Sequence, residues 1–203
     1  MRVLTVIAHP NPQSFAHAAA KEFTRGLADG KHESHVVDLH AIGFNPLFQV
    51  QDYAQFLNSP IPGGTPKDVV EQQAAVTWAD GLVFVRPVFW MGFPAILKGW
   101  IERVFAYGFA CSLTPEGWKG DLSGRIPLLK HKKALIISGT FFDERHYRLE
   151  GWGPAMNKSV DEWTFSNPGI TNVQRVMFYG LNAADEATRK KHLETAYRLG
   201  KEF

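Results

Sequence analysis

The segment Arg86-Pro-Val-Phe-Trp-Met-Gly-Phe-Pro-Ala-Ile-Leu-Lys-Gly-Trp-Ile-Glu-Arg-Val-Phe105 is the most informative part of this 203-residue chain. An apolar run that starts at Gly81 leads into it and is typical of a strand buried on both faces of a parallel sheet. The segment ends as a helix with an apolar stripe, and Pro94 suits its first turn. Four large apolar side chains lie between the strand and the helix, namely Phe89, Trp90, Met91 and Phe93. They indicate either a wall for a flat aromatic ligand or a cover for the core.

Apolar runs on both sides of this segment predict an α/β domain. Strands are expected at residues 3–8, 34–39, 81–86, 133–138 and 173–179, and helices at residues 15–27, 67–78, 94–105, 154–165 and 184–202. Because strands and helices alternate, we expect a single domain over residues 1–203. Its sheet is a doubly wound one of five parallel strands in the order 2-1-3-4-5, with helices on both faces.

Three stretches lack this regularity. Residues 40–66 are rich in proline and glycine and read as an excursion from the domain, with one short helix around residues 50–57. Residues 106–131 form a second long loop, and loops of that length inside a domain are usually functional. Residues 147–152 are also expected to be a loop.

Composition excludes several classes of protein. The net charge is only +2 and the Lys and Arg residues are mixed with acidic ones, which does not favour nucleic acid as a partner. The single cysteine, Cys111, excludes an internal disulfide and fits a reducing compartment. The first apolar run is too short for a signal peptide, and no run reaches the length of a membrane span. We therefore expect a cytoplasmic protein.

Common catalytic motifs are missing, which narrows the candidate chemistry. No Gly-x-Gly-x-x-Gly follows the first strand, and there is no Gly-x-Ser-x-Gly elbow. His32, His35 and His40 lack metal-ligand partners nearby, so no metal site is expected. What remains is the loop from His9 to Phe15. There Ser14 is placed to cap a helix whose first amides attract anions.

Three motifs give the chain a resemblance to a known family. They are Ala8-His9-x-x-x-x-Ser14-Phe15, the long segment from Pro87 to Phe105, and Gly139-Thr140 followed by Tyr147-x-Leu149-x-Gly151. With these motifs, and over almost its whole length, the chain resembles the flavodoxin-like NAD(P)H:quinone oxidoreductases. That group includes the mammalian quinone reductases and the bacterial modulator-of-drug-activity proteins.

The resemblance implies a flavodoxin-like fold, a bound flavin and a ping-pong reaction in which NAD(P)H reduces the flavin and a quinone reoxidises it. We expect FAD, with FMN as the alternative. Carried over by position, three sets of residues would bind the cofactor: His9, Ser14, Phe15 and His17 at the phosphates; Pro87, Val88, Phe89, Trp90, Met91, Gly139, Thr140, Phe141 and Phe142 around the ring; and Arg189 and Glu194 on the adenosine side.

The catalytic residue implied by the family is Tyr147, but this chain departs from the family pattern around it. Gly153 occupies the place of the family's catalytic histidine, so a Tyr-His relay cannot be copied as a whole. Cys111 and Leu113 correspond to substrate-pocket tyrosines, and Phe141 and Phe142 replace small glycines. The alternative role for Tyr147 is that of a structural residue.

The family also implies a homodimer with each active site completed by the second subunit. One alternative function stays open: a regulatory flavoprotein subunit of a potassium-efflux-type system with a membrane partner. A one-electron flavodoxin carrier is disfavoured, because carriers of that kind are usually strongly acidic.

Overall fold

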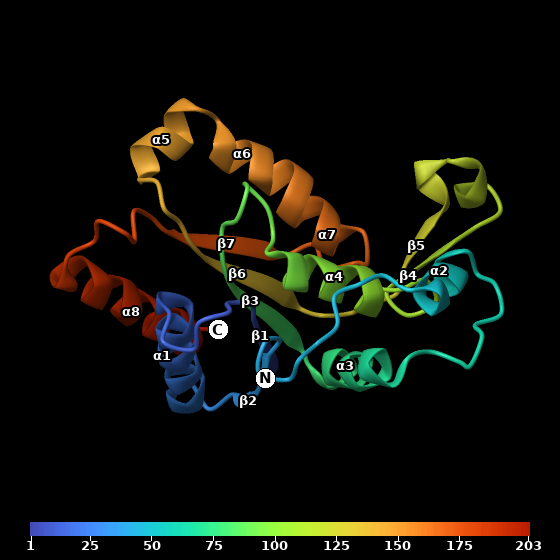
Figure 1. The fold of residues 1–203 in the computed structure, drawn as a ribbon, viewed down its shortest axis with the longest axis horizontal. Coiled ribbons are helices and arrows are strands. Elements are labelled where there is room, and N and C mark those ends of the chain that lie inside the picture. Colours follow the sequence, from blue (N-terminus) through green and yellow to red (C-terminus); the bar gives the residue numbers. More distant parts are fainter.

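The computed structural model describes residues 1–203 and contains a five-stranded parallel sheet in the order β2-β1-β3-β6-β7 (Figure 1). The strands are β1 Arg2–Ile7, β2 Glu33–Asp38, β3 Gly81–Pro87, β6 Lys133–Gly139 and β7 Val173–Phe178. In a count of five strands this is the predicted order 2-1-3-4-5. The prediction of a flavodoxin-like doubly wound sheet is therefore confirmed.

The strand register brings the carboxyl ends of the central strands to one edge. Ile7 of β1 pairs with Val85 of β3, and Pro87 of β3 pairs with Gly139 of β6. One further hydrogen bond, from the Val88 amide to the Gly139 carbonyl at 2.8 Å, extends the pairing into the loops that follow. The segments after β1, β3 and β6 therefore converge.

Helices cover both faces of the sheet, and each face has its own apolar core. Helices α1 (Phe15–Asp29) and α8 (Glu186–Lys201) cover one face, where Phe23, Leu27 and Phe203 are buried. Helices α3 (Lys67–Trp78), α4 (Ala95–Val104) and α7 (Trp163–Ser166) cover the other face, where Trp100 and Phe165 are buried. The continuous apolar runs of the strands reflect this burial from both sides.

Two of the expected loops contain regular structure. Residues 106–131 include an antiparallel hairpin of β4 (Cys111–Leu113) and β5 (Arg125–Pro127) and two 3₁₀ turns, Gly117–Lys119 and Leu122–Gly124. The expected loop at 147–152 overlaps α5 (Glu144–Leu149), which Asp143 caps by accepting a hydrogen bond from the His146 amide at 3.0 Å. The predicted helix at 154–165 is a run of α6 (Trp152–Met156), a π-helical segment (Asn157–Glu162) and α7. These elements are too short for periodicity to reveal them.

The excursion at residues 40–66 is anchored to α4 by a buried arginine. Arg103 donates to the carboxylates of Asp52 (2.9 Å) and Asp68 (2.6 Å) and to the carbonyl of Asn45 (2.7 Å). Asp52 lies in the short helix α2 (Val50–Phe56), which forms where it was expected. In Figure 1, α2 and the β4–β5 hairpin lie at the same end of the molecule.

None of the helices has the length and apolar character needed to cross a membrane.

Helices α1 and α8 cross at two glycines that allow their backbones to touch. A Cβ atom at Gly26 would lie 2.0 Å from the Tyr197 carbonyl oxygen, and a Cβ atom at Gly200 would lie 2.0 Å from the Phe23 carbonyl oxygen. Any larger residue must push the helices apart. This contact therefore fixes the position of α8, and of the side chains it carries, relative to the start of α1.

We predict that Gly200→Ala lowers the free energy of unfolding by about 2–3 kcal/mol, because the new methyl group overlaps backbone that cannot move aside. Urea denaturation measures this change. Gly153→Ala is the matched control: its Cβ atom would meet nothing within 4 Å. Equal stability of the two variants would contradict the close-crossing explanation.

Candidate functional site

A cavity of about 580 Å³ opens at the converging strand ends. Its walls come from the loops after β1, β3 and β6, the start of α1 and the region leading into α8. Ten of the residues predicted to bind a cofactor line it: His9, Ser14, Phe15, Pro87, Val88, Phe89, Gly139, Thr140, Phe141 and Arg189. The structure therefore brings together residues that are up to 180 positions apart in the sequence, from His9 to Arg189.

The start of α1 forms the anion-binding end of this cavity. Ser14 is the N-cap and accepts a hydrogen bond from the His17 amide at 3.3 Å. The first-turn amides of Phe15 and Ala16 have no acceptor within the helix, and both residues line the cavity. Free amides at the positive end of a helix of 15 residues are suited to bind a phosphate.

His17 supports this end from behind and does not line the cavity. Its ring bonds Ser14 Oγ through Nδ1 at 2.9 Å and Asp38 Oδ2 through Nε2 at 2.8 Å. Burial alone would raise the pKa of Asp38, but hydrogen bonds from His17 and from the amides of Ala41 and His40 hold it below its usual value. The Asp38 carboxylate therefore stays charged and fixes the imidazole against Ser14.

A tight turn after β3 forms the apolar wall. The Gly92 amide donates to the Phe89 carbonyl at 2.9 Å, and both central residues have left-handed backbones, with φ of 49° at Trp90 and 56° at Met91. This conformation normally requires Asn or Gly, and each bulky residue held in it costs on the order of 1–3 kcal/mol. Strain of this size is characteristic of functional loops.

The turn also presents hydrogen-bond donors. The amides of Trp90 and Met91 donate to no acceptor within the protein, whereas Phe89 forms a backbone bridge with Gly92, and the Trp90 side chain is fully exposed. Phe89 lines the cavity, whereas Trp90 and Met91 lie at the tip of the turn outside it. The turn therefore combines an apolar side chain on the cavity wall with unpaired backbone donors at its tip, a combination that suits the polar edge of an aromatic ring system.

The loop after β6 forms the opposite side. The Thr140 hydroxyl donates to the Phe142 carbonyl at 2.6 Å, and the Thr140 amide donates to the Phe178 carbonyl at 2.9 Å. Phe141 lines the cavity with a largely exposed ring, and Phe142 packs beside it with ring centroids 5.2 Å apart. Phe142 itself is not part of the lining.

Tyr147 is buried behind this loop. Its ring packs at right angles against Trp152, with centroids 5.5 Å apart, and edge-on at 63° against Tyr179, with centroids 5.4 Å apart. Burial raises the pKa of Tyr147, and the nearby positive charge of Arg86 only partly opposes that shift. The hydroxyl therefore stays protonated at neutral pH and can act as a donor. Tyr147 is not among the cavity-lining residues.

The two residues predicted on α8 are placed differently from each other. Arg189 lines the cavity and is held by two carbonyl oxygens, that of Leu181 at 2.7 Å and that of Ala184 at 3.1 Å. Glu194 is exposed on the same helix and does not line the cavity.

Arg86, which was not among the predicted site residues, also surrounds the cavity. Its side chain is fully buried and donates through Nη1 to the Gly92 carbonyl at 2.7 Å, so it ties down the end of the strained turn. Its charge faces Asp161, with Nη2 and Oδ1 3.8 Å apart, and Asp161 also binds Arg175. In the sequence Arg86 is only the last residue of an apolar strand, and its partners lie far along the chain.

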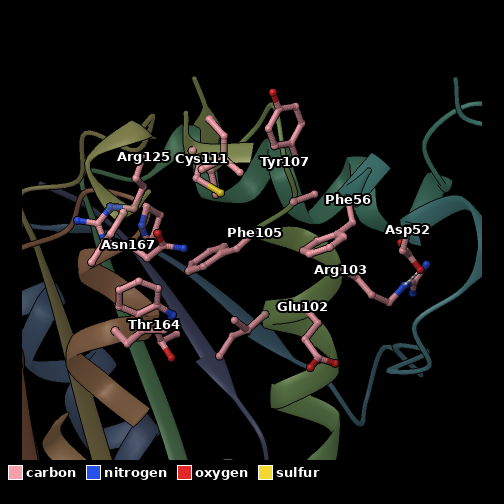
Figure 2. A pocket seen from close by; sticks show the side chains of 18 of the residues that line it. Asp52, Phe56, Glu102, Arg103, Phe105, Tyr107, Cys111, Arg125, Thr164 and Asn167 are labelled. Carbon is pink, nitrogen blue, oxygen red and sulfur yellow. Dashed lines mark hydrogen bonds and ion pairs between the residues drawn. The ribbon is translucent and has the colours of Figure 1, made fainter. Parts of the chain in front are cut away.

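A second cavity, of about 690 Å³, lies between α4 and the β4–β5 hairpin. Phe56, Phe105 and Cys111 come from three different segments and face the same hollow (Figure 2). Burial raises the pKa of the Cys111 thiol, which therefore stays protonated at neutral pH. We assign the cofactor to the cavity at the strand ends, because the first turn of the 15-residue helix α1 and the strained turn after β3 both lie there.

The combination of features at the strand ends fits a flavin. The start of α1 suits a phosphate, the Phe89–Gly92 turn offers an apolar wall with free amides, and Arg189 supplies a positive charge at the outer end. Hydride or electron transfer is the chemistry that a flavin supplies when bound, so the protein itself needs few acid–base groups. The sparse set of titratable residues around the cavity agrees with this.

Comparisons with known proteins point to the same class. A family model for the flavodoxin-like fold matches residues 1–199. An NAD(P)H oxidoreductase of Haemophilus influenzae, described as uncharacterized, is 30% identical over 97% of this chain and 92% of its own length. NAD(P)H dehydrogenase (quinone) 1 of Cavia porcellus is 33% identical over 77% of this chain, which spans 59% of that relative.

A solved structure with a similar fold gives the same assignment. The NAD(P)H:quinone oxidoreductase of Methanothermobacter marburgensis superposes with a TM-score of 0.86 at 26% identity, over 100% of this chain and 96% of the other. The chain therefore belongs to the flavodoxin-like NAD(P)H:quinone oxidoreductase family.

Proposed function

We propose that this protein is a flavin-dependent NAD(P)H:quinone oxidoreductase that works by a ping-pong reaction, in which NAD(P)H and then a quinone use the same site in turn. The observation that carries the proposal is the cavity at the strand ends. It joins the unpaired first-turn amides of α1 to a strained apolar turn with two free amides, those of Trp90 and Met91. No observation favours the alternative role as a regulatory subunit of a membrane system.

Each wall of the cavity has a defined task in this proposal. Ser14, Phe15 and Ala16 hold the phosphate at the start of α1, with His9 beside them on the cavity wall and His17 as support from behind. The turn from Phe89 to Gly92 and the loop from Gly139 to Phe142 enclose the ring. The backbone donors of the turn stabilise negative charge on the ring because they are fixed in place before the reaction.

FAD is the cofactor that we propose, with FMN as the alternative. Arg189 extends the cavity past the phosphate end, where an adenosine half could lie, and its guanidinium is held by two carbonyl oxygens. Glu194 was expected on the same side but lies exposed further along α8. The cytoplasmic location and the choice between NADH and NADPH stay predictions.

Tyr147 is the proposed catalytic donor. Its protonated hydroxyl can hydrogen-bond to the ring from the side of Thr140, and it does so without the family's histidine, whose place Gly153 takes. Tyr147 is buried behind the loop after β6. A bound flavin ring would therefore have to approach the Tyr147 hydroxyl past Thr140.

A second copy of the chain is the proposed occupant of the larger cavity. Exposed aromatic and aliphatic side chains surround it, including Phe56, Trp118, Leu122 and Trp163, of which Phe56 is 59% and Leu122 63% exposed. A patch of this kind on a protein surface usually marks an interface. A homodimer would cover the patch and bring Cys111 and Leu113 toward the partner's acceptor site.

We expect the purified protein to carry, or to take up, a flavin visible in absorbance between about 350 and 500 nm, and to oxidise NADH or NADPH when menadione is added. Chromatography of the released cofactor separates FAD from FMN. Absence of flavin after reconstitution with both would refute the proposed function.

Ser14→Asp is predicted to keep the fold but weaken flavin binding at least about tenfold, because aspartate caps a helix as well as serine while its charge repels a phosphate. Titration of the apoprotein with flavin measures the affinity. Ser14→Asn is the matched neutral control and should bind like the wild type. Wild-type affinity in the aspartate variant would mean that the phosphate binds elsewhere.

Tyr147→Phe is predicted to slow quinone reduction roughly tenfold or more while flavin stays bound, because a hydrogen bond to a charged group is lost. Steady-state kinetics and cofactor content are the two measurements. Tyr179→Phe removes the neighbouring hydroxyl and serves as the control. An unchanged rate in Tyr147→Phe would make Tyr147 a structural residue.

Phe56→Arg is predicted to convert the dimer to a monomer, because it places a charge in the centre of the proposed interface. Light scattering coupled to size exclusion measures the mass. Val36→Arg, on the edge strand β2, introduces the same charge outside the patch and should leave the dimer intact. A monomeric wild-type protein would refute the dimer without affecting the flavin proposal.

A further inference from the structure

One residue of the cavity wall, Arg86, belongs to a buried ionic cluster that the activity described above does not use. This cluster consists of Arg86 at the end of β3, Asp161 in the π-helical segment and Arg175 on β7. Arg86 and Asp161 are fully buried, and the Arg175 side chain is 9% exposed. Burial of three charged side chains is costly, and such groups are retained mainly where they have a task.

The cluster carries a net positive charge. Asp161 is the only carboxylate paired with either arginine: Arg86 Nη2 lies 3.8 Å from Oδ1, and Arg175 Nε donates to Oδ2. Two positive charges and one negative charge leave one positive charge. Burial lowers the pKa of Arg86 only to about 10, so its guanidinium remains charged at neutral pH.

The hydrogen bonds of the cluster are incomplete. Arg86 Nε and Nη2, Arg175 Nη2 and Asp161 Oδ1 have no hydrogen-bond partner. A cluster that served only to hold elements together would be expected to pair its donors, because each unpaired buried group costs about 1–3 kcal/mol. The excess positive charge is thus left unneutralised beside the cavity.

The cluster contacts two positions next to the proposed site of the flavin ring, which are the strained turn after β3 and Gly153. Arg86 donates to the Gly92 carbonyl at 2.7 Å and stacks on Phe93 at 4.6 Å, so its charge lies directly behind the strained turn. At the other end, Arg175 Nη1 donates to the carbonyl of Gly153 at 3.2 Å. Gly153 is the position at which the resemblance predicts a histidine, so an arginine lies next to the place where that histidine is missing.

We propose that Arg86, held by Asp161 and Arg175, is a positioning residue that supplies a permanent positive charge behind the ring-binding turn and so favours the state of a bound flavin that carries more negative charge. This inference rests on the proposed function. In this arrangement, the histidine that the resemblance predicts at position 153 is absent, and the permanent charges of Arg86 on β3 and Arg175 on β7 take its place. Tyr147, whose protonated hydroxyl lies in the field of Arg86, completes the arrangement.

The midpoint potential of the bound flavin tests this proposal, because a purely structural role would not move it in a defined direction. Arg86→Met removes the charge and keeps much of the volume. It should weaken binding of the reduced relative to the oxidised cofactor about tenfold, which lowers the two-electron potential by about 30 mV. Arg86→Lys keeps the charge and should restore most of the potential.

Asp161→Asn is the matched variant, and it is expected to shift the midpoint potential in the opposite direction. It removes the only negative charge of the cluster and should raise the potential, whereas Arg86→Met lowers it. Shifts of the same sign in the two variants, or no shift in either, would overturn the proposal. If Arg86→Met does not fold, the sign of the Asp161→Asn shift decides.

Failure of this inference can be separated from failure of the proposed function. A wild-type protein that binds no flavin refutes both. A wild-type protein that binds flavin, together with variants whose affinity for the oxidised cofactor falls while the potential stays constant, refutes only the electrostatic role of Arg86 and leaves it a structural anchor of the turn.

Discussion

The parallel register of β1, β3 and β6 is the constraint on which the site depends. Because Ile7 lies beside Val85 and Pro87 lies beside Gly139, every loop that follows these strands must emerge at the same edge. The anion-binding start of α1, the strained turn and the loop after β6 meet for this reason alone. A slip of one residue would turn each strand's side chains to the other face and separate the walls.

The sequence was sufficient to predict the sheet order and the three loops at its edge. Buried parallel strands appear as uninterrupted apolar runs, and the rule that ligands bind at carboxyl strand ends needs no further information. The β4–β5 hairpin could not be predicted, because strands of three residues leave no alternation to detect. Helix α5 was also missed, since its six residues hold less than two turns of periodic pattern.

Individual side chains show where prediction from sequence ends. His17 was expected to line the cavity, yet Asp38, 21 positions further on, binds its ring and turns it into support for Ser14. Arg86 was read as the last residue of a strand, because its partner Asp161 lies 75 positions away in a π-helical segment that no local pattern indicates. Both outcomes are set by a tertiary contact, a hydrogen bond for His17 and an ion pair for Arg86, which local propensity does not contain.

The left-handed turn at Trp90 and Met91 has a consequence for how this protein can change over evolutionary time. Asparagine and glycine would relax its backbone, so a search for heat-resistant variants that ignored function would converge on those two residues. Such variants would lose the bulky side chains at the tip of the turn. Resistance to heat and the apolar surface at the tip of the turn are therefore opposed at two neighbouring positions.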